Sequence, residues 1–236
     1  MRVLILIPAY NEASSLPQVI ADVRQHVPDA DILVVDDASS DATAALLPQL
    51  GVRWVRLSQR LGTGTAVRTG LRYAAARGYE IVVRIDGDGQ HPPEEINRLL
   101  VPLLHGAGDV VIGSRYAAGR TAATPPVRRL IHRMLAEVLS LMTNQLVTDP
   151  TSGFWAFSEQ ALHVLVDHHP SGYPEPELLL FLNRNGLRVI EVPVEMRTRI
   201  AGRTSLTPQR TWSAMARLLL LLVVVPLRSA VEGNRD

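Results

Sequence analysis

The chain has 236 residues, of which 47% are hydrophobic, so it is long enough to bury the core of one large α/β domain. Its 24 basic and 23 acidic side chains leave a formal net charge of +1, which argues against a nucleic-acid partner attracted by the field of the whole molecule. The chain contains neither lysine nor cysteine, which excludes Schiff-base chemistry, a P-loop lysine, thiol catalysis, disulfides and cysteine-ligated zinc.

Strand and helix patterns alternate along the chain. Residues 3–8 form a continuous apolar run, as expected of a strand buried on both faces in a parallel sheet, and Ser14 and Ser15 are candidate caps of the helix that follows. We expect further strands at 31–37, 52–57, 80–86, 109–114 and 188–196, and helices at about 41–50, 65–78, 93–104 and 127–147. This alternation predicts an α/β fold with a doubly wound, mostly parallel sheet and flanking helices.

The C-terminal part of the chain differs in character. We expect a main domain over residues 1–210, followed by an apolar helix and tail over 211–236. The apolar run 218–227 is shorter than the ~20 residues that span a bilayer. Its spacing fits core packing, a homodimer contact or a helix lying on a membrane surface between Arg217 and Arg228. The N-terminal apolar run is too short for a signal peptide, so we expect a cytoplasmic protein that is either free or peripheral at the membrane.

Polar side chains gather where the predicted strands end. In parallel sheets the carboxyl ends of the strands lie at one edge, where ligands bind. Four of these strand ends carry acids or an arginine, which is hard to attribute to chance. These residues are Tyr10, Asn11 and Glu12, then Asp36 and Asp37, then Asp86 and Asp88, and finally Ser114 and Arg115.

Asp86 and Asp88 are separated by one glycine and followed by another. Side chains two apart on an extended segment share a face, so the two carboxylates converge and repel unless a cation lies between them. Oxygen ligands suit Mg²⁺ or Mn²⁺, which complete their shell with substrate phosphates, and Gln90 offers a third oxygen. A surface turn built from alternating Asp and Gly is the alternative. The position at a strand end favours the metal.

A second acidic segment covers residues 35–41. Asp41 fits an ordinary helix cap, whereas Asp37 stands at the first turn after a strand, where nucleotides are bound in this architecture. The glycine-rich segment 61–70 matches the dinucleotide fingerprint poorly, because its glycines do not directly follow a strand. A helix N-terminus there would still favour a phosphate or a base carbonyl.

Six motifs then occur in one order over almost the whole chain. They are PAYNE (8–12), VVDDASSD (34–41), GTGTA (62–66), DGDGQHP (86–92), GSRY (113–116) and DPTSGF (149–154). Together they resemble the inverting glycosyltransferases of family 2, and most of all the branch of dolichyl-phosphate mannose synthases and polyprenyl-phosphate glycosyltransferases. The resemblance implies a GT-A fold, a nucleotide-diphosphate sugar donor, either a GDP- or a UDP-sugar, and a divalent Mg²⁺ or Mn²⁺ ion.

The resemblance also implies roles for individual residues. The nucleoside would be held by Pro8, Tyr10, Glu12, Val35 and Asp37. The diphosphate would be surrounded by Asp86, Gly87 and Asp88, with the metal on Asp86, Asp88 and Gln90, and Arg115 would pair with phosphate. The family's later R-x-x-G-x-S-K stretch aligns with Arg199, Gly202, Thr204 and Ser205, so this chain has Ser205 in place of the lysine. Arg203 is the nearest replacement for that charge. The family's D-A-D is D-G-D here.

The acceptor is left open between two chemistries. A polyprenyl phosphate is already anionic and needs no strong general base, and Arg128, Arg129 and Arg133 on the helix 127–147 could bind it. Those arginines fit a solvated helix face equally well. A hydroxyl acceptor needs a base, for which Asp149 is the first candidate, followed by Glu175 and Glu177. Asp149 could instead orient arginines on the acceptor side. Phe154 and Trp155 fit either the acceptor pocket or the core, and His91 adjoins the metal motif.

The residues and the resemblance together predict a metal-dependent inverting glycosyltransferase that moves a sugar from a nucleotide-diphosphate sugar to a polyprenyl phosphate, with Asp88, Arg115, Asp149 and Arg199 as candidate catalytic residues. Its first rival is a soluble transferase acting on the hydroxyl of a small molecule or glycan. A nucleotidyltransferase shares the nucleotide-binding sheet but usually requires a lysine or an N-terminal glycine-rich loop. A non-catalytic sensor of sugar nucleotides would bind the donor without transferring the sugar.

Overall fold

The computed structural model describes residues 1–117, 126–168 and 175–200. The chain divides into two units, Met1–Gly202 and Arg203–Asp236, and every described residue belongs to the first. The expected boundary at residue 210 and the expected apolar helix over 211–236 lie outside the described residues.

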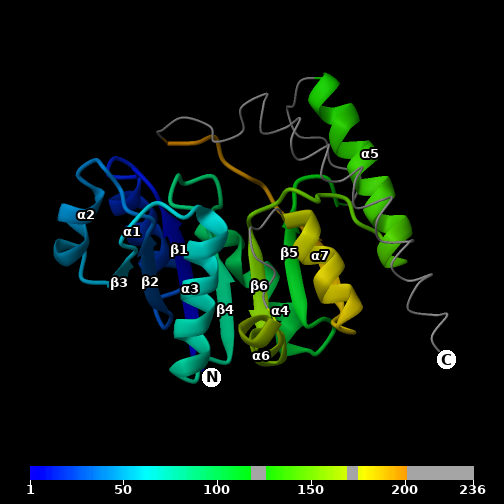
Figure 1. The fold of residues 1–236 in the computed structure, drawn as a ribbon, viewed down its shortest axis with the longest axis horizontal. Coiled ribbons are helices and arrows are strands. Elements are labelled where there is room, and N and C mark those ends of the chain that lie inside the picture. The colour runs from blue at the N-terminus through cyan, green and yellow to red at the C-terminus, as the bar shows by residue number, and fades with distance from the viewer. Residues whose placement is uncertain (118–125, 169–174, 201–236) are drawn as a thin grey trace. The chain divides into compact units, whose positions relative to one another are not determined.

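The described residues form a seven-stranded sheet with the order β3-β2-β1-β4-β6-β5-β7 (Figure 1). All neighbouring strands are parallel except β6, which is antiparallel to both β4 and β5. The predicted mostly parallel α/β sheet is thereby confirmed. The strands are β1 (Val3–Ala9), β2 (Asp31–Asp36), β3 (Arg53–Arg56), β4 (Ile81–Arg84), β5 (Val110–Ser114), β6 (Trp155–Ser158) and β7 (Val189–Pro193).

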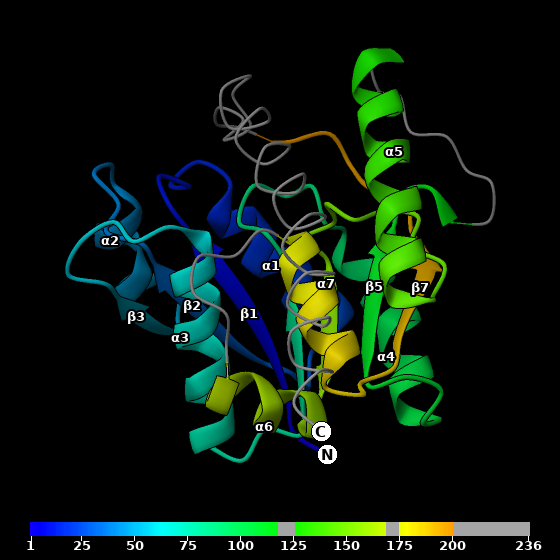
Figure 2. The same cartoon turned by 45° about the vertical axis from the view of Figure 1, so that its right-hand side comes forward.

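Helices cover both faces of the sheet (Figures 1 and 2). One hydrophobic core lies between the sheet and α3, α5, α6 and α7, and a second lies between the sheet and α1 and α4. Successive residues of β1 belong to opposite cores, which explains the continuous apolar sequence of that strand. The helices are α1 (Leu16–His26), α2 (Thr43–Leu46), α3 (Thr63–Ala76), α4 (Ile96–Leu104), α5 (Pro126–Thr143), α6 (Glu159–His168) and α7 (Glu175–Arg184), with 3₁₀ turns η1 (Leu47–Gln49) and η2 (Pro93–Glu95).

Strand β6 is the main element that the sequence pattern did not predict. It has only four residues, WAFS, and lies in the middle of the sheet. Trp155 and Phe157 pack into one core, and Ala156 into the other. A short apolar run of this kind cannot be distinguished by periodicity from a buried segment of another type. Two further helices, α6 and α7, lie between β6 and β7.

The topology brings four strand ends to one edge of the sheet. β1, β2 and β4 are parallel, and β4 and β5 run in the same direction because each is antiparallel to β6. Ala9 and Asp36, the last residues of β1 and β2, are paired in register. The predicted site residues that follow these strands therefore meet at this edge.

Gly70 in α3 sets how closely that helix approaches the sheet. A Cβ atom at this position would lie 2.1 Å from Leu6 Cδ1, on the fully buried strand β1. We expect Gly70→Ala to destabilise the protein by about 1–3 kcal/mol, because overpacking outweighs the ~1 kcal/mol gain in helix propensity. Urea unfolding measures this change. Arg72→Ala, at an exposed position of the same helix, should change stability little, and a Gly70→Ala variant as stable as the parent would contradict this packing.

Candidate active site

The proposed nucleoside corner lies at the ends of β1 and β2. Pro8 and Val35 are buried register partners in these strands. The guanidinium carbon of Arg60 lies 3.9 Å from the centre of the Tyr10 ring, a cation-π contact. The carboxylate of Asp37 accepts hydrogen bonds from two backbone amides, those of Leu61 at 2.7 Å and Gly62 at 2.8 Å.

These contacts bring the segment after β3 into the corner that the strand ends form. Asp37 is almost fully buried, and its two backbone contacts hold the turn at Gly62, which has a positive φ of 93°. Asp37 therefore has a structural function in shaping the corner. Arg60 was not predicted from the sequence, because an exposed arginine in a polar loop gives no signal until its partner is known.

An acidic cluster of Glu12, Asp86 and Asp88 lies at the ends of β1 and β4. Burial raises the pKa of Asp88, and the negative charge of Asp86 raises it further. Burial also raises the pKa of Glu12, and Asp88 and Asp86 add to the increase. The charges of Asp86 and Asp88 therefore act on each other, as expected for neighbouring carboxylates, and both act on Glu12. Gly87 fits this crowding, since a Cβ atom there would lie 3.4 Å from Glu12 Cγ.

Asp88 is held from two sides. Its Oδ1 accepts a hydrogen bond from the backbone amide of Gln90 at 2.9 Å, and its Oδ2 lies 2.8 Å from Arg199 Nη2. The same Arg199 nitrogen lies 3.4 Å from Gln90 Oε1. The backbone amide of Ile200 also donates to the carbonyl of Asp88. The segment around Arg199 is therefore attached to the loop of the predicted metal ligands.

Asp86 is oriented by two buried side chains. The backbone amide of Asp86 donates to His91 Nδ1 at 2.9 Å, so the neutral ring carries its proton on Nε2, which lies 3.9 Å from Asp86 Oδ2. Burial lowers the pKa of His91, and its ring stacks on Phe154 with a centroid distance of 5.2 Å. Arg84 Nη2 lies 3.5 Å from Asp86 Oδ1.

Arg84 and Gly153 also lie at this corner, and sequence reasoning assigned neither of them to the site. Arg84 is buried in β4, and it is the one charged residue in the otherwise apolar run of that strand. A Cβ atom on Gly153 would lie 3.0 Å from Asp86 Oδ2 and 3.1 Å from His91 Cε1. Arg84 and Arg199 thus each place a positive charge beside one of the paired aspartates. A charge inside a buried strand was the available signal for Arg84.

The donor atoms of this corner fit a hard divalent cation. Asp86, Asp88 and Gln90 offer carboxylate and amide oxygens, which are the ligands that Mg²⁺ and Mn²⁺ prefer. Within the described residues, no group of three or more His, Cys, Asp or Glu side chains is placed to hold a metal. By their chemistry alone, Asp86, Asp88 and Gln90 would suit an ion that takes two carboxylates and an amide and completes its shell with water or phosphate oxygens.

Arg115 is fixed by a bidentate ion pair. Its Nε lies 2.7 Å from Asp149 Oδ2, and its Nη2 lies 2.7 Å from Asp149 Oδ1. The backbone amide of Arg115 donates to the same carboxylate at 3.1 Å, and Nη2 also donates to Thr151 at 2.9 Å. Asp149 is fully buried. Of the two roles considered for Asp149, the contacts favour orienting an arginine over accepting a proton from a hydroxyl.

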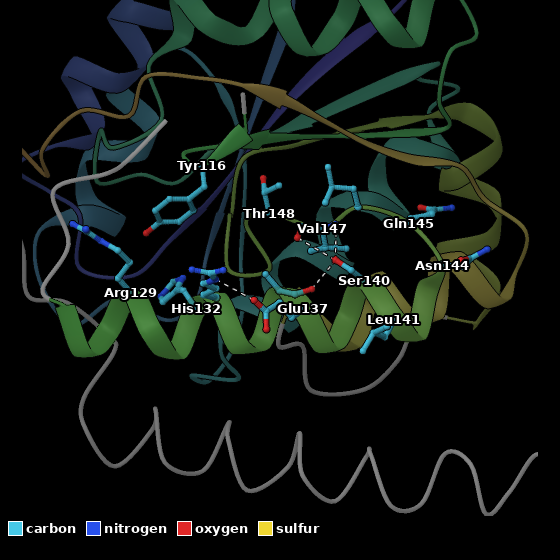
Figure 3. A pocket seen from close by; sticks show the side chains of 13 residues that line it. Tyr116, Arg129, His132, Glu137, Ser140, Leu141, Asn144, Gln145, Val147 and Thr148 are labelled. Carbon is cyan, nitrogen blue, oxygen red and sulfur yellow. Dashed lines mark hydrogen bonds and ion pairs between the residues drawn. The ribbon is translucent and has the colours of Figure 1, made fainter. Parts of the chain in front are cut away.

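A pocket of about 850 Å³ runs along α5 (Figure 3). Tyr116, Arg129 and His132 lie at one end, and Leu141, Asn144 and Gln145 lie at the other. His132 Nδ1 is 3.3 Å from Thr151 Oγ1, so the basic end of the pocket connects through Thr151 to Arg115. Most of the surface that lines the pocket belongs to apolar atoms, although many of the lining residues are polar.

The remaining predicted residues divide into three groups. Phe154 and Trp155 are fully buried core residues, so their aromatic rings do not line the pocket. Arg133 lines the pocket and pairs with Glu137 at 3.0 Å, and Glu177 lies half-buried on α7. The side chains of Arg128 and Glu175 lie outside the described residues, as do Gly202, Arg203, Thr204 and Ser205.

The chain is similar in sequence to known proteins. The family model described as Glycosyl transferase family 2 matches residues 4–166. The polyprenol monophosphomannose synthase of Mycolicibacterium smegmatis is 34% identical over 92% of this chain and 85% of its own length. The undecaprenyl-phosphate mannosyltransferase of Micrococcus luteus is 33% identical, covering 88% of each chain.

The chain is also similar in structure to a solved enzyme that was crystallised with ligands. Glucosyl-3-phosphoglycerate synthase from Mycobacterium tuberculosis, in complex with Mn²⁺, UDP and phosphoglyceric acid, superposes with a TM-score of 0.68 at 25% identity. The match covers 95% of this chain and 78% of that one. The same enzyme with Mn²⁺, UDP-glucose and phosphoglyceric acid matches with a TM-score of 0.67 at 27% identity, over 92% of this chain and 76% of its own.

Asp149→Asn tests the ion pair at Arg115. The substitution leaves a largely buried guanidinium without its carboxylate, so we expect a loss of about 3 kcal/mol in the free energy of unfolding. Asp109→Asn is the matched control, because Asp109 pairs in the same bidentate manner with Arg188, whose side chain is 57% exposed, against 22% for Arg115. The control should lose clearly less, because solvent screens the charge of the more exposed Arg188. Equal losses in urea unfolding would show that Asp149 is no more important to the fold than a surface partner.

Proposed function

The chain belongs to glycosyl transferase family 2, and on that basis we propose that it transfers a sugar from a nucleotide-diphosphate sugar to a polyprenyl phosphate, with the help of Mg²⁺ or Mn²⁺. The observation that carries the proposal is the joining of two sites at one sheet edge. The acidic cluster lies at the ends of β1 and β4, and Arg115, at the end of β5, connects to an apolar pocket with a basic end.

The donor side is supported by the strand-end residues. Tyr10 and Asp37, with the adjoining Arg60, would hold the nucleoside of a GDP- or UDP-sugar. Asp86, Asp88 and Gln90 would hold the cation, which when bound neutralises charge that builds up on the departing diphosphate. Arg199 already contacts two of these three side chains and would exchange that contact for a phosphate oxygen of the donor.

The acceptor side is supported by charge and shape. The pocket along α5 is long, and most of its surface is apolar, which suits a polyprenyl chain. Arg129, His132 and Arg133 also line it and would bind the phosphate. Arg115 is connected to His132, at the basic end of the pocket, because both side chains contact the Thr151 hydroxyl. A phosphate acceptor needs no strong general base, which agrees with both oxygens of Asp149 being bound to Arg115.

The transfer forms one bond and breaks one. An oxygen of the lipid phosphate bonds to the anomeric carbon, the bond from that carbon to the donor's β-phosphate oxygen breaks, and the nucleoside diphosphate leaves with the electron pair. Both reactants are anions, so the chain must bring two negative groups together. Arg115 and Arg199, whose guanidinium groups keep their charge at any physiological pH, lower this electrostatic cost.

Membrane association is part of the proposal. Among the described residues no helix is long and apolar enough to cross a membrane. Leu130, Met134, Leu141 and Leu146, on and just after α5, are nonetheless 60%, 59%, 84% and 82% exposed. We propose that this surface touches the cytoplasmic face of the membrane, where a polyprenyl phosphate resides. A homodimer contact is the alternative use of the same residues.

The direct test is product analysis. The protein is incubated with Mn²⁺, a GDP- or UDP-sugar and undecaprenyl phosphate, and lipid-linked sugar and free nucleoside diphosphate are measured. We expect both products in equal amounts. Transfer to a sugar alcohol but not to undecaprenyl phosphate would favour the hydroxyl-acceptor rival. Release of pyrophosphate from a nucleoside triphosphate would favour a nucleotidyltransferase, and binding without any product would favour a sensor.

Calorimetric titration with Mn²⁺ tests the metal ligands. Asp88→Ala should abolish Mn²⁺-dependent donor binding without unfolding the protein. Arg199→Ala should bind Mn²⁺ alone about 10-fold more tightly, because the ion no longer competes with a charge-assisted hydrogen bond for Asp88 and Gln90. Arg197→Ala is the control, since Arg197 pairs with Asp22 and Glu94 outside the ligand set. Unchanged titration of Asp88→Ala would remove Asp88 from the metal site.

A further inference from the structure

Glu191 has no assigned role in donor or acceptor binding, yet it joins two segments of the site. It lies on β7, the edge strand that pairs with β5 alone, and is in register with Ile112. Its side chain reaches the segment between α5 and β6. The backbone amide of Thr148 donates to both oxygens of Glu191, at 2.9 and 3.0 Å, and the amide of Asp149 donates to Oε1 at 3.1 Å.

The hydroxyl groups around Glu191 have defined directions. The Thr148 hydroxyl donates to Glu191 Oε2 and therefore accepts from the Ser114 hydroxyl, whose oxygen is 2.6 Å away. Ser114 Oγ in turn accepts hydrogen bonds from the backbone amides of Tyr116 at 3.1 Å and Ala117 at 3.0 Å. The hydrogen bonds therefore run from the amides of Tyr116 and Ala117 through the hydroxyl groups of Ser114 and Thr148 to the Glu191 carboxylate. Ser114 is fully buried.

Both segments that Glu191 joins end at Arg115. Ser114 precedes Arg115 and shapes the turn that follows it, and Asp149 binds the guanidinium at 2.7 Å through each oxygen. The amide of Asp149 is bound by Glu191 while its side chain is bound to Arg115, so the residue is held at both ends. Burial raises the pKa of Glu191, and the hydrogen bonds from Thr148 and Asp149 oppose that increase.

We propose that Glu191 is a positioning residue that fixes the guanidinium of Arg115 through Thr148, Asp149 and Ser114. The effect on transfer rests on the proposed function, because it assumes that Arg115 binds a phosphate. The positioning itself is independent of that assumption. A phosphate at Arg115 would meet a rigid fork, and small displacements of such groups reduce rates strongly.

Position 191 requires two oxygen atoms that both accept hydrogen bonds, which a carboxylate provides and a glutamine amide does not. All four hydrogen bonds described above for the Glu191 carboxylate come from donors, and a glutamine amide offers an acceptor on one side only. The glutamine NH₂ group would face either the Thr148 hydroxyl or the backbone amides. If the Thr148 hydroxyl reversed, Ser114 Oγ would have to accept a third hydrogen bond. Glu191→Gln is therefore a near-isosteric variant that disturbs the network while keeping its volume.

The first readout does not depend on activity. In ¹⁵N NMR spectra the Nε–H group of Arg115, bound to a buried carboxylate, should give a protected resonance, which is assigned by its loss in Arg115→Lys. We expect Glu191→Gln to shift this resonance and speed its hydrogen exchange. Asp109→Asn is the control, because it loosens the same β5–β7 pair through Arg188 at the other end of the strands. An unchanged Arg115 resonance in Glu191→Gln would overturn the proposal.

The second readout is a double-mutant cycle with the transfer reaction. Glu191→Gln should lower kcat/KM by about 10-fold to 100-fold, and by much less when Arg115 is already alanine. Asp109→Asn should lower kcat/KM little, and equally in both backgrounds. An equal Glu191→Gln loss in both backgrounds would mean that Glu191 does not act through Arg115. Failure of the wild-type protein to transfer sugar would refute the proposed function, and the NMR comparison would still decide the role of Glu191.

Discussion

Repulsion between carboxylates is the constraint on which this site depends. Glu12, Asp86 and Asp88 lie at the ends of two neighbouring strands, and burial makes the negative charge of Glu12 and Asp88 costly. The fold offsets that cost with two arginines, one close to the aspartates in sequence and one distant. Arg84 comes from within β4 and Arg199 from the segment after β7, each beside one aspartate. A divalent cation would balance the negative charge that remains.

Because the chain has no lysine, the permanently charged cationic side chains of the site are all arginines. A guanidinium keeps its charge when buried and presents several donors in a plane, so one arginine can hold a carboxylate and orient itself at the same time. Arg115 does this with Asp149 and Thr151, and Arg199 does it with Asp88 and Gln90. Asp149 and Glu191 form a carboxylate layer behind Arg115. Each of these arginines is thus held in place by a carboxylate and a second polar side chain.

Much of the fold could be predicted because its signals are local. The buried runs of β1 and β2, the alternation with helices and the polar strand ends all follow from residues adjacent in sequence. Boundaries differed by a few residues, as for α5, expected to end near 147 and observed to end at Thr143. The short strand β6 was missed, because four apolar residues carry no period and only their neighbours β4 and β5 make them a strand.

The sequence by itself determined the chemistry of this protein: paired aspartates after a strand, an arginine at the end of β5, no lysine or cysteine, and the ordered motifs of a glycosyltransferase family. Residue types and short spacings are enough for that, because ligand chemistry depends on functional groups. The tertiary structure alone decided the partners. It joined Asp149 to Arg115 across 34 positions and Arg199 to Asp88 across more than 100, and it moved Phe154 and Trp155 into the core. Such pairings depend on how strands are ordered in the sheet, and no local pattern encodes that order.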